Sequence, residues 1–151
     1  GAPVAPENHD KEPWEEEKKD LGTRISELND TPDTTSEFDR NDIQSNKVMA
    51  VLAYIGLLVL VPLFAAKDSK YARFHTNQGL VLAITEFAWT FITRIIVSVL
   101  GYINASVASI IGSVCGLANI LFAVLLIMGI VNAVKGRAKE LPVIGKITIL
   151  K

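Results

Sequence analysis

Cysteine and histidine are scarce in this sequence, and acidic residues are scarce beyond its first third. The 151 residues include one cysteine, Cys115, and two histidines. A single cysteine excludes an intrachain disulfide, and its apolar surroundings favour an unreactive thiol. The sequence also lacks a glycine-rich phosphate loop and a nucleophile paired with a histidine and an acid. We therefore expect a protein that is not an enzyme and that holds no cofactor or catalytic residue.

Charge divides the chain near Asn46. Residues 1–46 carry 13 acidic and 5 basic residues, whereas residues 47–151 carry 3 acidic and 10 basic residues. Half of all residues are hydrophobic and the mean hydropathy is +0.34, which is too apolar for an ordinary soluble domain of this length. We predict an acidic disordered tail or linker at 1–46, a helical membrane domain at 47–140 and a basic interfacial tail at 141–151.

The acidic tail has too little apolar surface to offset the entropy of folding. One local exception follows Pro13, a residue that suits the first turn of a helix. Four apolar residues then fall on one helical face: Trp14, Leu21, Ile25 and Leu28. This pattern leaves two alternatives open, a transient solvated helix or a helix that docks on a partner. The acidic character argues against binding nucleic acid.

Three apolar segments predict an all-α integral membrane bundle of about three transmembrane helices. The predicted spans are residues 48–66, 79–101 and 106–134. The first has 19 residues without a charge, close to the roughly 20 that cross about 30 Å of hydrocarbon. The third lies in an uncharged run of 30 residues, about 45 Å as a helix, so it must tilt, bend or protrude.

The middle segment carries two charges, Glu86 and Arg94. Each charge costs about 2.5 to 3.5 kcal/mol at the centre of a spanning helix, so both are expected to have a polar partner. Two placements remain open: the helix spans with this face turned inward, or it lies flat in the interface. Spanning is favoured because the apolar run is of full length. The predicted intramembrane polar cluster comprises Glu86, Thr90, Arg94 and Asn119.

Small residues recur along the last apolar segment at alternating spacings of four and three. Without a hydrophobic force between helices in lipid, close backbone approach supplies the attraction, and small residues permit it. The stretch also contains a GxxxG match, "GSVCG". The predicted packing residues are Ala105, Ser109, Gly112, Gly116 and Ala123.

A polar connector, "AKDSKYARFHTNQGL" (residues 66–80), joins the first two predicted spans. Its basic, imidazole and amide side chains predict a location among the lipid headgroups: Arg73, His75, Asn77 and Gln78. We expect His75 to form hydrogen bonds there and not to bind a metal, because the only other histidine is His9 in the distant tail. No metal site is predicted in this chain.

The distribution of basic residues predicts the orientation of a multi-pass protein of the cell membrane. With three spans, the connector and the C-terminal tail share one side and carry eight Lys or Arg residues, whereas only Arg40 and Lys47 lie near the membrane on the other. The positive-inside rule then places the C-terminus in the cytoplasm and the acidic tail outside.

The connector motif "RFHTNQG" (residues 73–79) and the tail from Leu141 to Lys151 resemble a bacterial family of small multi-spanning membrane proteins of unknown function. The similarity covers about residues 46–151. That family is distantly similar to the twenty-kilodalton component of the chloroplast inner-envelope import complex. The resemblance implies three or four spans and a translocation-related or scaffolding role, with no enzymatic role.

The first four residues, "GAPV", resemble the sequence that follows the second cysteine of a zinc-ribbon knuckle. A metal-binding module would then lie upstream of Gly1. Zinc is therefore expected only in such a missing segment.

Two classes of function remain. The first is an interaction or scaffolding protein that packs against itself or a membrane partner through the small-residue seam. The alternative is a subunit of an oligomeric transporter or channel in which Glu86 and Arg94 line a polar path. Three helices make a thin pore wall, so we favour the first. The expected partners are the lipid bilayer and a second copy or another membrane protein, with no nucleic acid.

Overall fold

The computed structural model describes residues 13–150, and the chain forms two units that meet in sequence between Asp30 and Thr31. The zinc-ribbon resemblance at residues 1–4 lies outside the described residues. The predicted domain boundary at residue 46 is wrong, because residues 31–46 belong to the second unit, where Ile43 is buried in the core.

The first unit contains helix α1, Pro13–Leu28, which begins at proline as predicted. An ion pair joins Arg24 to Asp20 one turn away, with an N–O distance of 3.2 Å. The ammonium group of Lys18 lies 4.8 Å from the centre of the Trp14 ring. All four predicted face residues are about half exposed. The helix is therefore amphipathic with an uncovered apolar face, and its docking on a partner stays a prediction.

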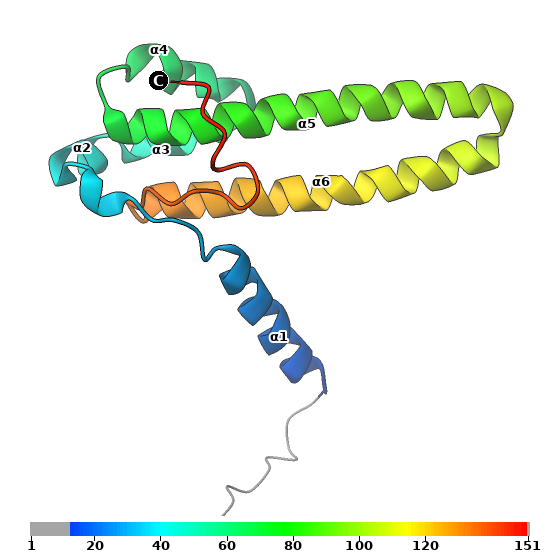
Figure 1. Cartoon of the computed structure of the whole chain (residues 1–151), viewed down its shortest axis with the longest axis horizontal. Coiled ribbons are helices and arrows are strands. Elements are labelled where there is room, and N and C mark those ends of the chain that lie inside the picture. The colour runs from blue at the N-terminus through cyan, green and yellow to red at the C-terminus, as the bar shows by residue number, and fades with distance from the viewer. Residues whose placement is uncertain (1–12, 151) are drawn as a thin grey trace, which may run out of the picture. The chain divides into compact units, whose positions relative to one another are not determined.

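The second unit is built on a hairpin of two long helices, α5 (Lys70–Ile103) and α6 (Ala105–Val134), which run side by side in opposite directions (Figure 1). Short helices gather around one end of this hairpin, which we call the base. They are η1 (Thr35–Glu37), α2 (Arg40–Ser45), α3 (Lys47–Leu52), η2 (Gly56–Val59) and α4 (Leu60–Ala65). The far end, the tip, is the turn at Asn104.

Polar side chains fix the ends of the long helices. The Ser69 hydroxyl accepts a hydrogen bond from the Ala72 amide, which caps the start of α5. At the tip, Asn104 adopts an extended backbone and its side chain accepts from the amides of Ser106 and Val107. One residue therefore ends α5 and begins α6.

The predicted first span is wrong in its form. Residues 48–66 do not make one helix: α3 ends at Leu52, and the chain turns at Gly56, which has a φ of +50°. Glycine adopts such a conformation at little steric cost. The chain then returns through η2 and α4, so this apolar segment forms a short re-entrant turn against the hairpin.

Two other glycines allow this turn to pack closely against the long helices. A Cβ atom on Gly79 would lie 1.9 Å from the carbonyl oxygen of Ala53, and one on Gly129 would lie 2.3 Å from the ring of Tyr54. Only glycine permits so close an approach at either place. Ala53 and Tyr54 are consequently buried between α5 and α6.

Two helices are long and apolar enough to cross a membrane in the described part of the chain, α5 and α6. The architecture is an all-α helical membrane bundle, as predicted. The count of about three spanning helices is corrected to two such helices and one re-entrant turn.

Candidate functional site

The base of the hairpin contains a buried polar cluster on α5. His75, Thr76 and Gln78 are almost entirely buried. The phenol oxygen of Tyr54 lies 2.6 Å from Nδ1 of His75, and Nε2 of His75 lies 2.9 Å from the carbonyl oxygen of Arg137. Since a carbonyl oxygen can only accept, Nε2 carries the proton and Tyr54 donates to Nδ1. His75 is thus a neutral, fully bonded imidazole.

Side chains of α5 bind the backbone of the segment that follows α6. Nε2 of Gln78 donates to the carbonyl of Lys139 at 3.2 Å, and its Oε1 accepts from the Leu141 amide at 2.9 Å. The Asn77 amide donates to the carbonyl of Ile147 at 2.8 Å and accepts from two further amides of this segment. The connector residues therefore hold residues 137–150 against the helix.

This arrangement corrects and extends the prediction for the connector. His75, Asn77 and Gln78 do form hydrogen bonds, but they lie inside α5 and not in a loop, and His75 and Gln78 are buried in protein. Arg73, also on α5, is partly exposed. The spacing of Tyr71, His75 and Gln78 by four and three residues was the signal for one buried helical face.

Residues 31–35 complete the base by pairing with the same segment. The Thr34 amide donates to the carbonyl of Ala138 at 3.0 Å, and the Glu140 amide donates to the carbonyl of Pro32 at 3.1 Å. A hydrogen bond from the Thr35 hydroxyl lowers the pKa of Asp33. The start of the second unit is therefore tied to its end.

Asp42 joins α2 to the beginning of α5. Its carboxylate accepts hydrogen bonds from the Ser69 hydroxyl at 2.5 Å and from the Tyr71 amide at 3.0 Å. A carboxylate at a helix N-terminus is also favoured by the helix dipole. Together with the C-terminal contacts, this makes the base a polar framework outside the long apolar part of the hairpin.

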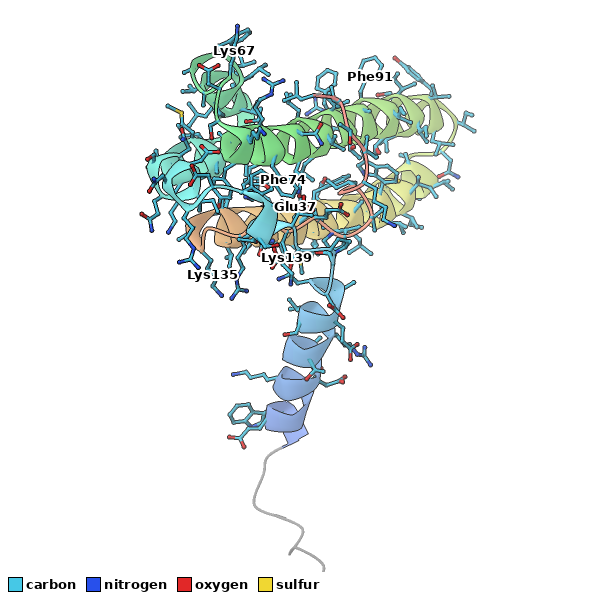
Figure 2. The ribbon with its side chains drawn as sticks, turned by 60° about the vertical axis from the view of Figure 1, so that its left-hand side comes forward. Glu37, Lys67, Phe74, Phe91, Lys135 and Lys139 are labelled. Atoms are coloured by element: carbon cyan, nitrogen blue, oxygen red, sulfur yellow. The ribbon has the colours of Figure 1, made fainter. Side chains whose placement is uncertain are left out.

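The half of the hairpin beyond the base is apolar and exposed. Large hydrophobic side chains are uncovered along α5 from Ile84 to Ile103 and along α6 from Val107 to Leu121. Phe91 projects outward from α5, whereas Lys67, Lys135 and Lys139 lie at the base (Figure 2). Such a surface suits a lipid environment, since water would make this exposure unfavourable.

The predicted polar cluster lies on this exposed half. Glu86, Thr90, Arg94 and Asn119 are all exposed, and within the described residues neither charged side chain forms a hydrogen bond or ion pair. A single chain therefore does not turn this cluster inward, contrary to the expectation. Two helices leave most of their circumference uncovered, so an inward orientation requires a further partner.

The predicted small-residue seam is not the contact between α5 and α6. Ala105, Ser109 and Ala123 are exposed, and a Cβ atom on Gly116 would meet nothing within 4 Å. The buried residues of α6 lie on a neighbouring face: Ala108, Phe122, Leu125, Met128, Gly129, Asn132 and Ala133. Gly112 lies at the edge of the seam, where its added Cβ would be 3.4 Å from Val97. Packing of the seam against another chain stays a prediction.

The seam and the charged residues border the same side of the hairpin. Val97, which Gly112 approaches, lies one helical turn after Arg94. Trp89 donates a hydrogen bond to the carbonyl of Cys115 at 3.2 Å, which is a second contact between these stretches of α5 and α6. Counting from the two contacts, the position opposite Glu86 falls between about residues 118 and 123, so Asn119 lies within about 6 Å of the height of Glu86. We call these residues the polar face: Glu86, Thr90, Arg94, Gly112, Gly116 and Asn119.

Comparison with known proteins identifies the family. The model of the magnetosome magnetite crystal formation protein family matches residues 45–148. Magnetosome protein MmsF of Paramagnetospirillum magneticum is 31% identical over 97 residues, which cover 64% of this chain and 79% of that protein. No solved structure matches the chain significantly.

Two shorter matches point the same way. Magnetosome protein MamF of Paramagnetospirillum magneticum is 51% identical over 35 residues, and MamF of Magnetospirillum gryphiswaldense is 49% identical over 35 residues. Each covers 23% of this chain, and the chain spans about a third of the length of these two relatives.

The matches confirm the expected small bacterial membrane-protein family. They lend no support to the relation with the chloroplast import component or to the zinc-ribbon resemblance. The protein belongs to the magnetosome magnetite crystal formation protein family.

Proposed function

We propose that this protein is a membrane scaffold whose hairpins cross the bilayer and associate in pairs through the polar face. The observation that carries the proposal is the exposure of Glu86 and Arg94 on helices long enough to span. Facing lipid, the two charges would cost about 5 to 7 kcal/mol on insertion scales. A second copy that covers the face removes this cost.

The heights of the polar residues suit a symmetric pair. A two-fold axis along the bilayer normal, placed against the polar face, sets α5 of one copy over α6 of the other. Residues at similar height then meet, which brings Glu86 of one copy to within about 6 Å of the height of Asn119 of the other. Gly112 and Gly116 give close backbone approach at the same interface. The small-residue seam thereby acts between chains.

Two spans also set the orientation. The tip at Gly101–Asn104 carries no charge, whereas the basic residues that the structure describes in the second unit, Arg94 excepted, all precede Phe74 or follow Val134 and so belong to the base. The positive-inside rule then places the base in the cytoplasm. Helix α1 directly precedes the base in the sequence, so this topology would leave the acidic helix on the cytoplasmic side as well. This replaces the expectation of an external tail, which depended on a third span.

The description of the family leads us to extend the proposal to the membrane that surrounds a forming mineral crystal. In this role the paired hairpins would anchor the bases, and the acidic first unit would be displayed at the membrane surface.

Disulfide crosslinking between two tagged copies in native membranes tests the pairing. In a Cys115→Ser background, one copy carries Thr90→Cys and the other Gly116→Cys, which lie on opposite helices of the polar face. The matched control uses Ile92→Cys and Leu117→Cys, which are exposed away from this face. We expect crosslinking of the first pair only, and equal crosslinking of both pairs would contradict the proposal.

Accessibility of the same thiol separates the scaffold from the transporter alternative. We expect Thr90→Cys in membranes to resist a membrane-impermeant thiol reagent, because the partner chain covers it. Rapid labelling would instead indicate a water-filled polar path between the copies.

A further inference from the structure

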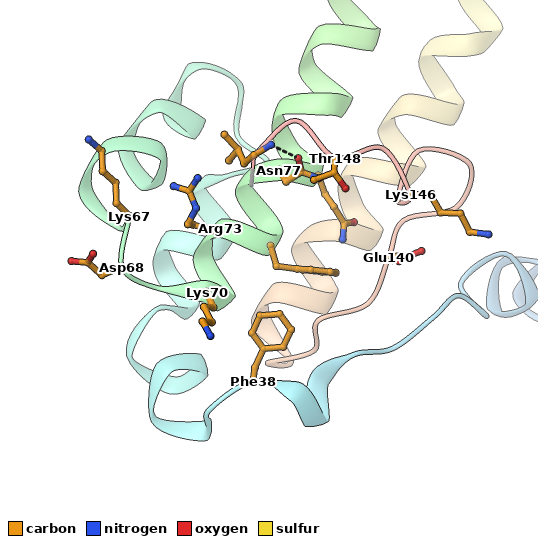
Figure 3. A pocket seen from close by; sticks show the side chains of 13 residues that line it. Phe38, Lys67, Asp68, Lys70, Arg73, Asn77, Glu140, Lys146 and Thr148 are labelled. Carbon is orange, nitrogen blue, oxygen red and sulfur yellow. Dashed lines mark hydrogen bonds between the residues drawn. The ribbon is translucent and has the colours of Figure 1, made fainter.

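A cavity of about 640 Å³ opens at the base, between the start of α5 and the C-terminal segment. Figure 3 shows Arg73 and Asn77 on α5, Thr148 of the C-terminal segment beside Asn77, and Phe38 below. Basic side chains outnumber acidic ones around it, with Lys67, Lys70, Arg73 and Lys146 against Asp68 and Glu140. The net charge of the lining side chains is therefore positive.

The C-terminal wall of this cavity is held in place by α5. Asn77 accepts hydrogen bonds from the amides of Ile149 and Leu150, at 2.6 and 3.0 Å, and donates to the carbonyl of Ile147. Three bonds from one side chain fix the backbone on both sides of Thr148. The cavity is thus formed by the fold, and Asn77 holds the backbone around Thr148 in its wall.

The position of the cavity along the hairpin matches the headgroup layer. Lys70 and Arg73 lie about 46 to 51 Å from the tip at 1.5 Å per residue, which an ordinary tilt of about 20° shortens to about 44 to 48 Å along the bilayer normal. A bilayer with its headgroups is about 40 to 45 Å thick, so the cavity lies at the outer edge of the headgroup layer. Phe64 and Leu57 of the re-entrant turn expose apolar side chains on the way toward the hydrocarbon. Lys67 lies over the Phe64 ring, 5.8 Å from its centre, where apolar and charged surfaces meet.

We propose that this cavity binds the anionic phosphate of a lipid headgroup. The guanidinium of Arg73 and the ammonium groups of Lys67 and Lys70 would donate charge-assisted hydrogen bonds to the phosphate oxygens. The Thr148 hydroxyl would supply a neutral donor. A cavity of this size also accommodates the glycerol next to the phosphate, while the acyl chains continue along the exposed apolar residues of α4. The site is independent of the polar face and of chain pairing.

Thermal unfolding of the purified full chain in a neutral detergent tests this site. Phosphatidylglycerol is added at increasing concentration, with phosphatidylcholine as the neutral lipid and glycerol phosphate as the soluble phosphate. A ligand that binds only the folded state raises the unfolding temperature in proportion to the logarithm of its concentration above Kd. We expect phosphatidylglycerol to raise it and phosphatidylcholine to leave it unchanged.

Two double variants separate a built site from general surface charge. Lys70→Gln with Arg73→Gln removes two charges from the cavity, and Lys135→Gln with Arg137→Gln removes two exposed charges elsewhere on the base. We expect the apparent affinity for phosphatidylglycerol to fall at least tenfold in the first variant, which is about the effect of losing one charge-assisted hydrogen bond. In the second variant we expect this affinity to change less than twofold. If the first variant does not fold, Lys67→Gln is used in its place, because Lys67 is exposed and its substitution should leave the fold intact. The same loss of affinity for phosphatidylglycerol is then measured.

The outcomes are distinct. Selective loss in the cavity variants with phosphatidylglycerol alone supports a lipid headgroup. The same loss with glycerol phosphate supports the phosphate site but assigns it a soluble ligand. Equal loss in both double variants, or no loss in either, overturns the proposal.

Discussion

Substitution of Gly79 by alanine is expected to destabilise the protein more than any other glycine-to-alanine change in α5 or α6. The added Cβ would lie 1.9 Å from the carbonyl oxygen and 2.7 Å from the carbonyl carbon of Ala53. Both atoms belong to the backbone of the re-entrant turn, so no side-chain rotation relieves the clash. The turn must therefore move by about 1 Å or more to restore an ordinary contact.

The magnitude follows from two opposing contributions. Alanine raises helix propensity by up to about 1 kcal/mol relative to glycine. Overpacking of a close-packed interior costs typically 1 to 3 kcal/mol, and displacement of backbone lies at the upper end. We expect a net loss of about 2 kcal/mol in the free energy of unfolding.

Gly101→Ala is the matched control, because Gly101 also lies on α5, outside the polar face, and nothing lies within 4 Å of its added Cβ. The propensity gain then stands alone, so we expect equal or slightly higher stability. Both variants are compared with the wild type by unfolding in detergent, with the folded fraction followed by size-exclusion chromatography. A Gly79→Ala protein as stable as the wild type, or an equal loss in Gly101→Ala, would refute the placement of the re-entrant turn.

Three further predictions concern the base and the polar face. Tyr54→Phe should lower the free energy of unfolding by about 1 to 2 kcal/mol, because it leaves buried Nδ1 of His75 without its donor; equal unfolding curves would contradict this. Gln78→Leu should release the segment after α6, seen as faster hydrogen exchange there with little change in the hairpin; unchanged exchange would show that its two bonds are dispensable. For Glu86→Gln and Arg94→Gln, a double-mutant cycle in membranes should show non-additive effects on folded yield and dimer content. Additive effects would exclude energetic coupling between Glu86 and Arg94.

The long helices were predictable from the sequence because they depend on local composition. No charge occurs between Arg94 and Lys135, and Asn104 separates two apolar segments within this stretch. Hydropathy therefore found both arms of the hairpin. Hydropathy placed the start of α5 too late, at residue 79, because the Tyr71–Gln78 stretch is polar in composition. In the structure this stretch is buried against protein, where its polar groups bind backbone atoms.

The re-entrant turn could not be read from hydropathy. Residues 48–66 have the length and apolarity of a span, and glycine and proline are tolerated in membrane helices. The break at Gly56 is instead set by tertiary contacts, namely the close approach of Ala53 to Gly79 and of Tyr54 to Gly129. These contacts join residues that are far apart in sequence, so no local pattern contains them.

The predicted site residues divide in the same way between local and long-range information. The four-residue spacing of Glu86, Thr90 and Arg94 correctly indicated one helical face, because helix geometry is local. Which way that face points depends on the number of neighbouring helices, and two helices leave it exposed. For the same reason, the spacing of small residues around Gly116 correctly placed them on one side of α6. It did not predict which helix they would pack against.

The two halves of the hairpin differ in what completes them. At the base, side chains of α5 such as His75, Asn77 and Gln78 bind backbone atoms of the same chain, so its polar groups are largely satisfied without a partner. Beyond Ile84, the exposed apolar surface suits lipid, and within the described residues Glu86 and Arg94 have no polar partner. In the proposed pair these two requirements are met separately, because lipid would cover the apolar side of each hairpin and a second copy would cover the polar face.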